Sequence, residues 1–578
     1  MAFTNQYLID FFKQRMVELF DVNTLDSYSV RTCNTLSIFC ELKDVLEGWV
    51  ACNVKRGDTV AKCIEECGAL IDVDEWLDYS FFDKDIMKAS LIDYAKKVKI
   101  IKDSREKKEI ENNEAKYIHH LVTSCITVND TTYLNELISS IRADLFTEKL
   151  YEENEFQTVI HRLDSKLSFM ATELLRRGYS KSYLYFFFKS IKVNKAGIPF
   201  EEAFDQLKIK FGTVHKFEDN VIIRLNFPNH TVPEMENLFD EVPAEYFSVM
   251  NESIRGFFKK TPNRRFYIVK ENAADTGAAL QKARLRLSQA LDRNNMGEMH
   301  ISNMAVVSYV KDGSCTLLTE KYYELDGGSK TESRLPIIMR KIDKAKVISN
   351  DIKDRLNTAL RHLRVGDEQA EIEQRFLNYW IGLEFIFSTP KSGDSTFARM
   401  IEKFPAMKTL YYLKRNINNL DLRLREKGLL GKDKSFGGLA EEEMDAAYNN
   451  TDDVLLKYRI KRMKSHLHDP EKVKAYLDTH AKNLEWHLSR IYHLRNELVH
   501  EAAIKHNIEG VSSNLRSYLV FMLNLLLDYC SMLLRQSPKD PMTMDNFFWH
   551  YEMLWKKCVP KYDKVDFLKL DIPEFYVR

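Results

Sequence analysis

The sequence predicts a mainly α-helical protein that carries one small α/β domain in its middle. Apolar residues recur three and four positions apart, with few prolines, up to about residue 212 and again from about residue 342. Short alternating segments and glycine-containing turns are confined to the part between. A chain of 578 residues is also too long for one ordinary domain. We therefore expect a helical N-terminal region (1–212), a small α/β domain (213–341) and a C-terminal helical bundle (342–578).

The individual elements follow from the same periodicities. In the N-terminal region, helices are expected at 87–98, 131–145 and 163–177. In the middle, we expect strands at 221–227, 265–270 and 304–310, a helix at 277–293, and a returning hairpin arm at 315–325 after a turn at 311–314. The C-terminal region is expected to form helices at 372–387, 395–404, 411–427, 473–499 and 512–534.

Composition limits the partners and the compartment. Lys plus Arg and Asp plus Glu number 85 each, so any surface for nucleic acid must be local. The most apolar stretch, 515–534, contains Arg516, Asn524 and Asp528, which favours a buried core helix over a membrane span. The nine cysteines form no C-x-x-C pair and no small-domain framework. Reduced cysteines indicate a cytoplasmic protein.

Metal and cofactor sites are not predicted. The H-x-H-D segment that begins at His466 offers three ligands, but no closing partner stands at ligand spacing. Cys63 and Cys67 are one helical turn apart, without further ligands around them. Residues 327–331 (GGSKT) resemble a phosphate-binding loop, but the first glycine of that motif is missing and no helix follows directly. We therefore expect no metal and no cofactor.

Residues 493–500 (HLRNELVH) form the segment with the strongest chemical signal. A guanidinium cannot lose its charge on burial, so Arg495, on the apolar side of this helix, needs a carboxylate, a phosphate or a partner chain opposite it. On a straight helix Arg495 and His500 would be about 140° apart. They converge only if the helix ends or bends near Val499 or if a second subunit completes the site. The apolar side is marked by Leu484, Leu488, Ile491 and Leu498.

At this point the residues resemble a known family. The RNELVH hexapeptide, with an amphipathic helix before it and an apolar helix after it, resembles a HEPN domain (higher eukaryotes and prokaryotes nucleotide-binding). FLNYWIGLEFIFS (376–388) is similar to the first domain helix of the ApeA-like branch. IVKENAADTGAALQKARLRLSQAL (268–291) resembles the segment before HEPN in ApeA-type antiphage proteins. The resemblance covers roughly residues 240–570 and implies a HEPN-like bundle at the C-terminal end.

The resemblance also implies an activity. HEPN nucleases cleave RNA without a metal, as homodimers, and ApeA-type proteins act in antiphage abortive infection. It therefore implies an RNA substrate, with transfer RNA as one candidate, and a phage-derived trigger. Arg495, Asn496 and His500 are the expected catalytic residues: His500 would move a proton, Arg495 would bind the charged phosphate and Asn496 would orient either group. Glu384 and His493 are expected to support them.

A local basic segment precedes this site. Lys457, Arg459, Lys461, Arg462 and Lys464 concentrate positive charge as RNA phosphates would require, although a solvated helix face would show the same pattern. The alternative function is a non-catalytic HEPN module that binds RNA or a regulatory partner. The presence of Arg495, Asn496 and His500 together favours the ribonuclease.

Overall fold

In the computed structural model the chain is mainly α-helical, as the periodicity predicts. The structure describes residues 4–21, 33–54, 56–80, 82–101, 109–147, 149–194, 197–212, 217–226, 240–241, 264–293, 303–306, 318–319, 334–369, 371–388, 395–501, 508–573 and 576–577. The chain divides into two compact units. Unit 1 contains Met1–Ser37 and Val128–Gly327, and unit 2 contains Ile38–Thr127 and Gly328–Arg578.

These units differ from the three consecutive regions that the sequence suggests. Residues 38–127, from the expected N-terminal helical region, belong with the C-terminal helices in unit 2. The rest of that region groups with the α/β part in unit 1. Periodicity shows which side of a helix is buried, but it does not show which partner buries it. The discontinuous grouping therefore could not be recognised from the sequence.

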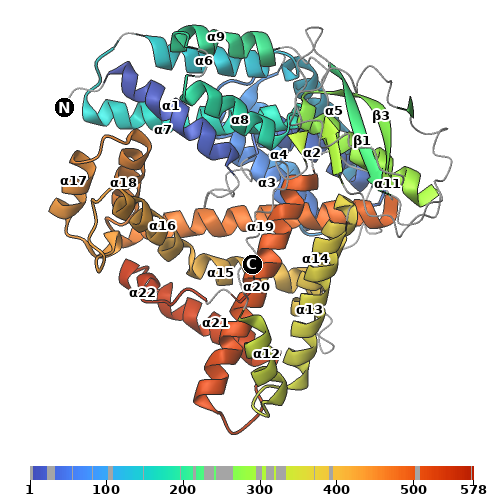
Figure 1. The fold of residues 1–578 in the computed structure, drawn as a ribbon, viewed down its shortest axis with the longest axis vertical. Helices are drawn as coiled ribbons and strands as arrows, with labels where there is room; N and C mark the ends of the chain where they lie inside the picture. The colour runs from blue at the N-terminus through green and yellow to red at the C-terminus, as the bar shows by residue number, and fades with distance from the viewer. Residues whose placement is uncertain are drawn as a thin grey trace. The chain divides into compact units, whose positions relative to one another are not determined.

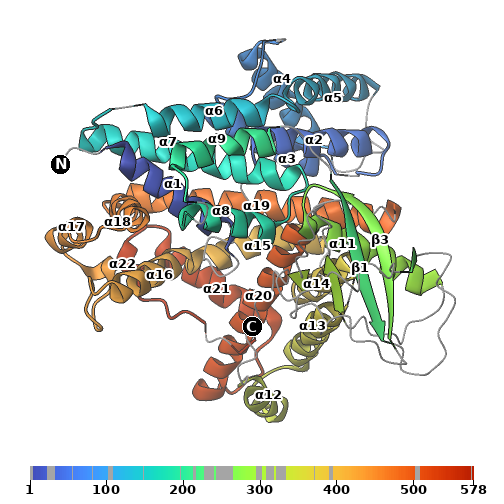
Figure 2. The same cartoon turned by 45° about the horizontal axis from the view of Figure 1, so that its top comes forward.

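The helices of unit 1 pack around aromatic side chains. Helix α1 places Leu8, Phe11, Phe12 and Met16 on one side, and all four are fully buried. Phe12 forms edge-on ring contacts with Phe188 of α8 and Phe204 of α9. Helices α1, α6, α7, α8 and α9 lie side by side in both views (Figures 1 and 2). Their bounds are α1 Asn5–Phe20, α6 Tyr133–Phe146, α7 Glu153–Arg176, α8 Lys181–Lys192 and α9 Phe200–Phe211.

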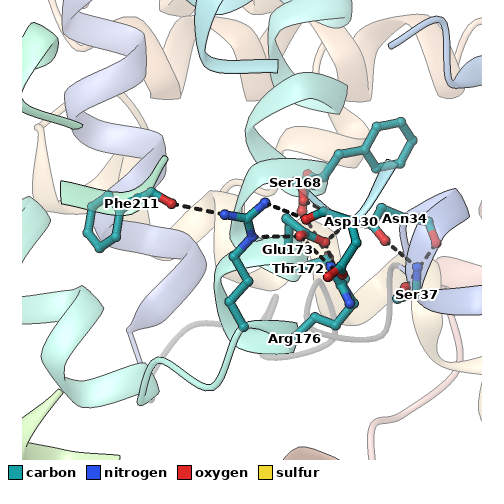
Figure 3. Close-up of polar contacts among 10 residues, drawn as sticks. Asn34, Ser37, Asp130, Ser168, Thr172, Glu173, Arg176 and Phe211 are labelled. Atoms are coloured by element: carbon teal, nitrogen blue, oxygen red, sulfur yellow. Dashed lines mark hydrogen bonds and ion pairs between the residues drawn. The ribbon is translucent and has the colours of Figure 1, made fainter. Parts of the chain in front are cut away.

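A polar network at the end of α7 links several of these segments (Figure 3). Glu173 is fully buried and accepts hydrogen bonds from Arg176 (2.8 Å) and Arg177 (2.9 Å). The amide of Asn34 donates to Glu173 (3.4 Å), and its oxygen accepts from the backbone N–H of Ser37 (2.7 Å). These bonds satisfy a charge that burial would otherwise leave unpaired.

The α/β part of unit 1 is an antiparallel five-stranded sheet in the order β2-β3-β1-β4-β5, with α11 packed against it. The predicted strands at 221–227, 265–270 and 304–310 correspond to β1, β3 and β4. The predicted hairpin is confirmed by the pairing of Ala305 with Thr319 and of Val306 with Leu318, while its turn lies outside the described residues. The bounds are β1 Phe217–Asn226, β2 Asp240–Glu241, β3 Arg264–Ala273, β4 Asn303–Val306, β5 Leu318–Thr319 and α11 Thr276–Arg293.

Unit 2 is helical throughout its described residues. Its N-terminal helices are α2 (Thr35–Val50, whose first three residues belong to unit 1), α3 (Gly57–Val73), α4 (Lys84–Lys99) and α5 (Glu109–Asn129, whose last two residues belong to unit 1). The later helices are α12 Leu335–Lys344, α13 Asn350–Glu368, α14 Ile372–Phe387, α15 Thr396–Leu410, α16 Tyr412–Glu426, α17 Glu441–Asn449, α18 Val454–His466, α19 Pro470–Glu501, α20 Ile508–Gln536, α21 Met544–Cys558 and α22 Lys564–Leu568.

Helix α20 lies at the centre of the bundle and contacts α12, α13 and α14 (Figure 1). Leu515, Leu519, Leu523 and Leu526 are all fully buried. Its residues Gly510–Gln536 are long and apolar enough to cross a membrane by length and composition, but most of the apolar stretch is buried within the fold. The close approach of α14 explains one glycine, because a Cβ at Gly382 would lie 2.9 Å from the Leu519 side chain. Burial inside the bundle agrees with the core-helix interpretation of this stretch.

Candidate active site

Helix α19 carries the candidate catalytic residues. Leu484, Leu488 and Ile491 are fully buried and Leu498 is 9% exposed, which confirms the predicted apolar side of the helix. Arg495 lies on this side and is half-buried. The helix packs against α14 and α15 through its apolar side chains, so the position of Arg495 on the bundle is fixed by core packing.

Arg495 contacts Asn496, its predicted partner in the motif. The Arg495 Nη1 donates a hydrogen bond to the Asn496 side-chain oxygen at 3.1 Å. Among the residues that the structure describes, no carboxylate forms an ion pair with this guanidinium. The bond orients two of the three motif residues and leaves the remaining guanidinium donors for another acceptor.

Helix α19 continues beyond the point where we expected an end. It runs through Val499 to Glu501, so the helix does not terminate near Val499. The backbone positions of Arg495 and His500 are consequently about 140° apart round one helix. The side chain of His500 lies outside the described part of the structure. A second subunit is then the simplest of the expected arrangements that would join the two groups.

The two supporting residues have other partners. His493 is 7% exposed, and its Nε2 lies 3.4 Å from Glu497 Oε1, one turn further along α19. Glu384 accepts a hydrogen bond from the Trp380 indole at 2.9 Å. Within the described residues, no ion pair joins Glu384 to Arg495. Trp380 itself packs against Tyr492, one turn before Arg495, at a ring distance of 5.9 Å, so Glu384 acts on the site through packing at most.

The predicted RNA-binding residues all lie on α18. Lys464 pairs with Asp445 of α17 at 2.6 Å, and this hydrogen bond raises the pKa of Lys464. The Lys457 and Lys461 ammonium groups lie 5.5 and 5.7 Å from the ring of Tyr448, also on α17. Three of the five cations are therefore engaged by a neighbouring acidic helix.

The other two members of this segment are more accessible. Arg459 is half-buried and Arg462 is exposed. Helix α17 begins with Glu441, Glu442 and Glu443, and a run of acidic residues beside a basic helix reduces the local positive potential. The structure thus places the basic segment on one helix but does not bring it into contact with Arg495 in the described residues.

No group of three or more His, Cys, Asp or Glu side chains suitable for a metal ion occurs in the described part of the chain. His466 stacks on Tyr476 (ring distance 4.3 Å), and His468 Nδ1 lies 3.2 Å from Asp469. Cys63 and Cys67 are both buried, and their mutual hydrogen bond together with burial raises the pKa of Cys63 well above its ordinary value. These thiols behave as core residues. Residues 327–331 lie outside the described residues.

Sequence reasoning missed a second set of charged residues on α19. Arg490 forms ion pairs with Glu41 of α2 and Glu66 of α3 at 2.6 and 2.7 Å, and Lys482 pairs with Glu65 of α3 at 2.7 Å. Arg490 and Glu66 are 424 residues apart in the chain, so no local pattern connects them. The one available signal was the adjacent Glu65 and Glu66 on a predicted amphipathic stretch.

No family profile, curated protein or solved structure matches this chain. The chemistry of the site is therefore argued from its own residues and their contacts.

Proposed function

We propose that the chain is a metal-independent endoribonuclease of the HEPN type that acts as a homodimer. The proposed reaction is an internal transesterification of RNA. The ribose 2′-oxygen bonds to the neighbouring phosphorus, the bond to the 5′-oxygen breaks, and the ends are a 2′,3′-cyclic phosphate and a 5′-hydroxyl. We propose transfer RNA as one candidate substrate, antiphage abortive infection as the biological role, and a phage-derived trigger for activity.

The three motif residues have distinct roles in this reaction. His500 takes the proton of the 2′-hydroxyl or gives one to the leaving 5′-oxygen, since an imidazole titrates near neutral pH. Arg495 donates hydrogen bonds to the phosphate as negative charge builds on it. Asn496 holds the guanidinium through the bond at 3.1 Å.

The observation that carries the proposal is the surroundings of Arg495. Its half-buried guanidinium has a neutral amide as its hydrogen-bond partner and, within the described residues, no carboxylate. Arg490, five positions earlier, is satisfied by two carboxylates. A half-buried guanidinium without an acidic partner favours a bound anion such as phosphate.

The homodimer follows from the continuous helix. Because α19 extends to Glu501, Arg495 and the backbone of His500 point to different sides of one chain. Two subunits related by a two-fold axis can present both groups to one phosphate. Light scattering on the full chain should then give about twice the chain mass of 67.8 kDa.

The test is cleavage of total RNA by the purified full-length protein in EDTA, with the new ends mapped. We expect cyclic phosphate ends, and a loss of about a hundredfold or more for His500→Ala, the usual scale of general acid–base catalysis. His468→Ala, an exposed histidine elsewhere in unit 2, is the matched control and should cleave normally. Equal cleavage by His500→Ala would reject the site. Binding without cleavage would favour the non-catalytic alternative.

A further inference from the structure

Helix α19 carries two cations before Arg495 that are occupied by carboxylates from α2 and α3. Lys482 lies 2.7 Å from Glu65, and Arg490 lies 2.6 Å from Glu41 and 2.7 Å from Glu66. Helices α3 and α19 are in contact in this unit (Figure 2). We call Lys482 and Arg490 the basic strip, and Glu41, Glu65 and Glu66 the acidic cluster.

The basic strip lies on the side of α19 where position 500 falls. Lys482 and His500 are eighteen residues apart, which is about five full turns, so their backbone positions are in line. Arg490 is ten residues before His500, about 15 Å along the axis and about 80° round it. A polyanion that approached His500 along this side of the helix would pass both cations.

We infer that the basic strip is a binding site for RNA backbone phosphates, and that the acidic cluster occupies it in place of those phosphates. The inference rests on the proposed function for its ligand. Carboxylates and phosphates both accept paired hydrogen bonds from a guanidinium, so one can replace the other on Arg490. While the acidic cluster is in place, it neutralises the strip and repels RNA. Displacement of the cluster frees both cations for the substrate.

The acidic cluster is bound in a way that permits exchange. Arg490 is shared by two carboxylates, so the pairing carries excess negative charge. Burial raises the pKa of Glu66 even though Arg490 lowers it, so desolvation of this carboxylate exceeds what its partner returns. Lys482 and Glu65 are 42% and 28% exposed, a setting in which ion pairs contribute little. Phosphates can therefore compete for the same cations.

Two sets of substitutions break the same ion pairs and separate the proposal from a purely structural role. Both are made in the full chain with His500→Ala, so that RNA stays intact, and binding of fluorescein-labelled single-stranded RNA is measured by anisotropy. Glu41→Gln with Glu66→Gln should bind RNA about tenfold more tightly, because Arg490 then gains a charged hydrogen-bond partner in RNA. The magnitude of the salt slope should rise by about 0.7 for each phosphate gained. Arg490→Gln should show neither gain.

The control is Glu368→Gln with Glu426→Gln, which removes two negative charges from exposed ion pairs with Arg364 and Arg423. It should change RNA affinity by less than about twofold. Circular dichroism during thermal unfolding establishes that each protein is folded, and Glu65→Gln against Lys482→Gln repeats the contrast at the more exposed end of the strip.

The inference is overturned if the glutamine variants bind RNA no more tightly than the His500→Ala parent, or if Arg490→Gln gains as much as they do. Because the measurement is binding, it does not depend on cleavage. Failure of the proposed nuclease would appear separately, as absence of cleavage by the chain with His500 intact.

Discussion

The two units solve the problem of a buried arginine–carboxylate contact in opposite ways. In unit 1 the fully buried Glu173 is shared by two arginines, and Asn34 gives it a further donor (Figure 3). In unit 2 one arginine, Arg490, is shared by two carboxylates near the surface. The first arrangement satisfies a carboxylate that water cannot reach. The second leaves more acid than base, which makes it suited to exchange with another anion.

The difference extends to the segments that each network joins. Arg176 also reaches Asp130, and Arg177 donates to the backbone oxygens of Asp130 and Phe211, so Glu173 links the ends of α5, α7 and α9 to the start of α2. Arg490 contacts only side-chain carboxylates in the bonds that the structure describes. A network that holds backbone ends is expected to determine folding, whereas a side-chain pair can open without unfolding its helices.

The largest effect on stability is expected at Glu173. Glu173→Gln removes the charge and leaves Arg176 and Arg177 without their shared acceptor, and Arg177 is 3% exposed. We expect a loss of about 3–5 kcal/mol in the free energy of unfolding, the range for a broken buried ion pair. Urea unfolding followed by circular dichroism measures it.

Glu155→Gln is the matched control on the same helix, because its pair with Lys149 is exposed and removal of its charge should change stability by less than about 1 kcal/mol. If Glu173→Gln unfolds at the same urea concentration as this control, the contrast between the two networks is lost.

The sequence is informative where one chain segment determines its own structure. The apolar side of α19 and the strands β1 and β3 follow from periodicity alone, and the core burial of Leu484 and Val221 confirms both. The positions of Arg495 and Asn496 are local for the same reason. The end of α19 was placed two residues early, at Val499, because no glycine or proline marks the boundary.

Contacts between distant segments could not be predicted. Nothing in a single helical pattern indicates that Arg490 meets Glu66, or that residues 38–127 pack with the C-terminal helices. The charge of the basic segment on α18 was visible, but its neutralisation depends on the packing of α17. The acidic start of α17 at Glu441 was readable; its place beside Lys464 was not.

A smaller and pH-dependent effect is expected at Glu66. Burial raises its pKa in the folded chain above the ordinary 4.5. As pH rises through 4.5, the unfolded chain loses this proton before the folded chain does, so the contribution of Glu66 to stability falls. Glu66→Gln does not titrate and should therefore become more stable relative to the parent as pH rises from 4 to 7, by up to about 1 kcal/mol.

Thermal unfolding of the parent and Glu66→Gln across this pH range measures the difference. Asp469, an exposed carboxyl whose pKa is lowered by the backbone N–H of Lys472, provides the opposite case, because Asp469→Asn should lose stability relative to the parent as pH rises. A destabilisation by Glu66→Gln that grows toward neutral pH would show that Arg490 holds this carboxylate as firmly as Glu173 is held, and would remove the basis for exchange.

The smallest effect sharpens the comparison by setting its baseline. Arg364 and Glu368 form an exposed ion pair one turn apart on α13, at 2.6 Å and with side chains 62% and 60% exposed. Water and salt screen such a pair, so Glu368→Gln should lower the free energy of unfolding by about 0.5 kcal/mol or less, and by nothing measurable in high salt. Urea unfolding at low and high salt tests both statements. If this exposed pair proved worth as much as Glu173, removal of any acidic charge would destabilise the chain through its net charge, and neither network could be assigned a local role.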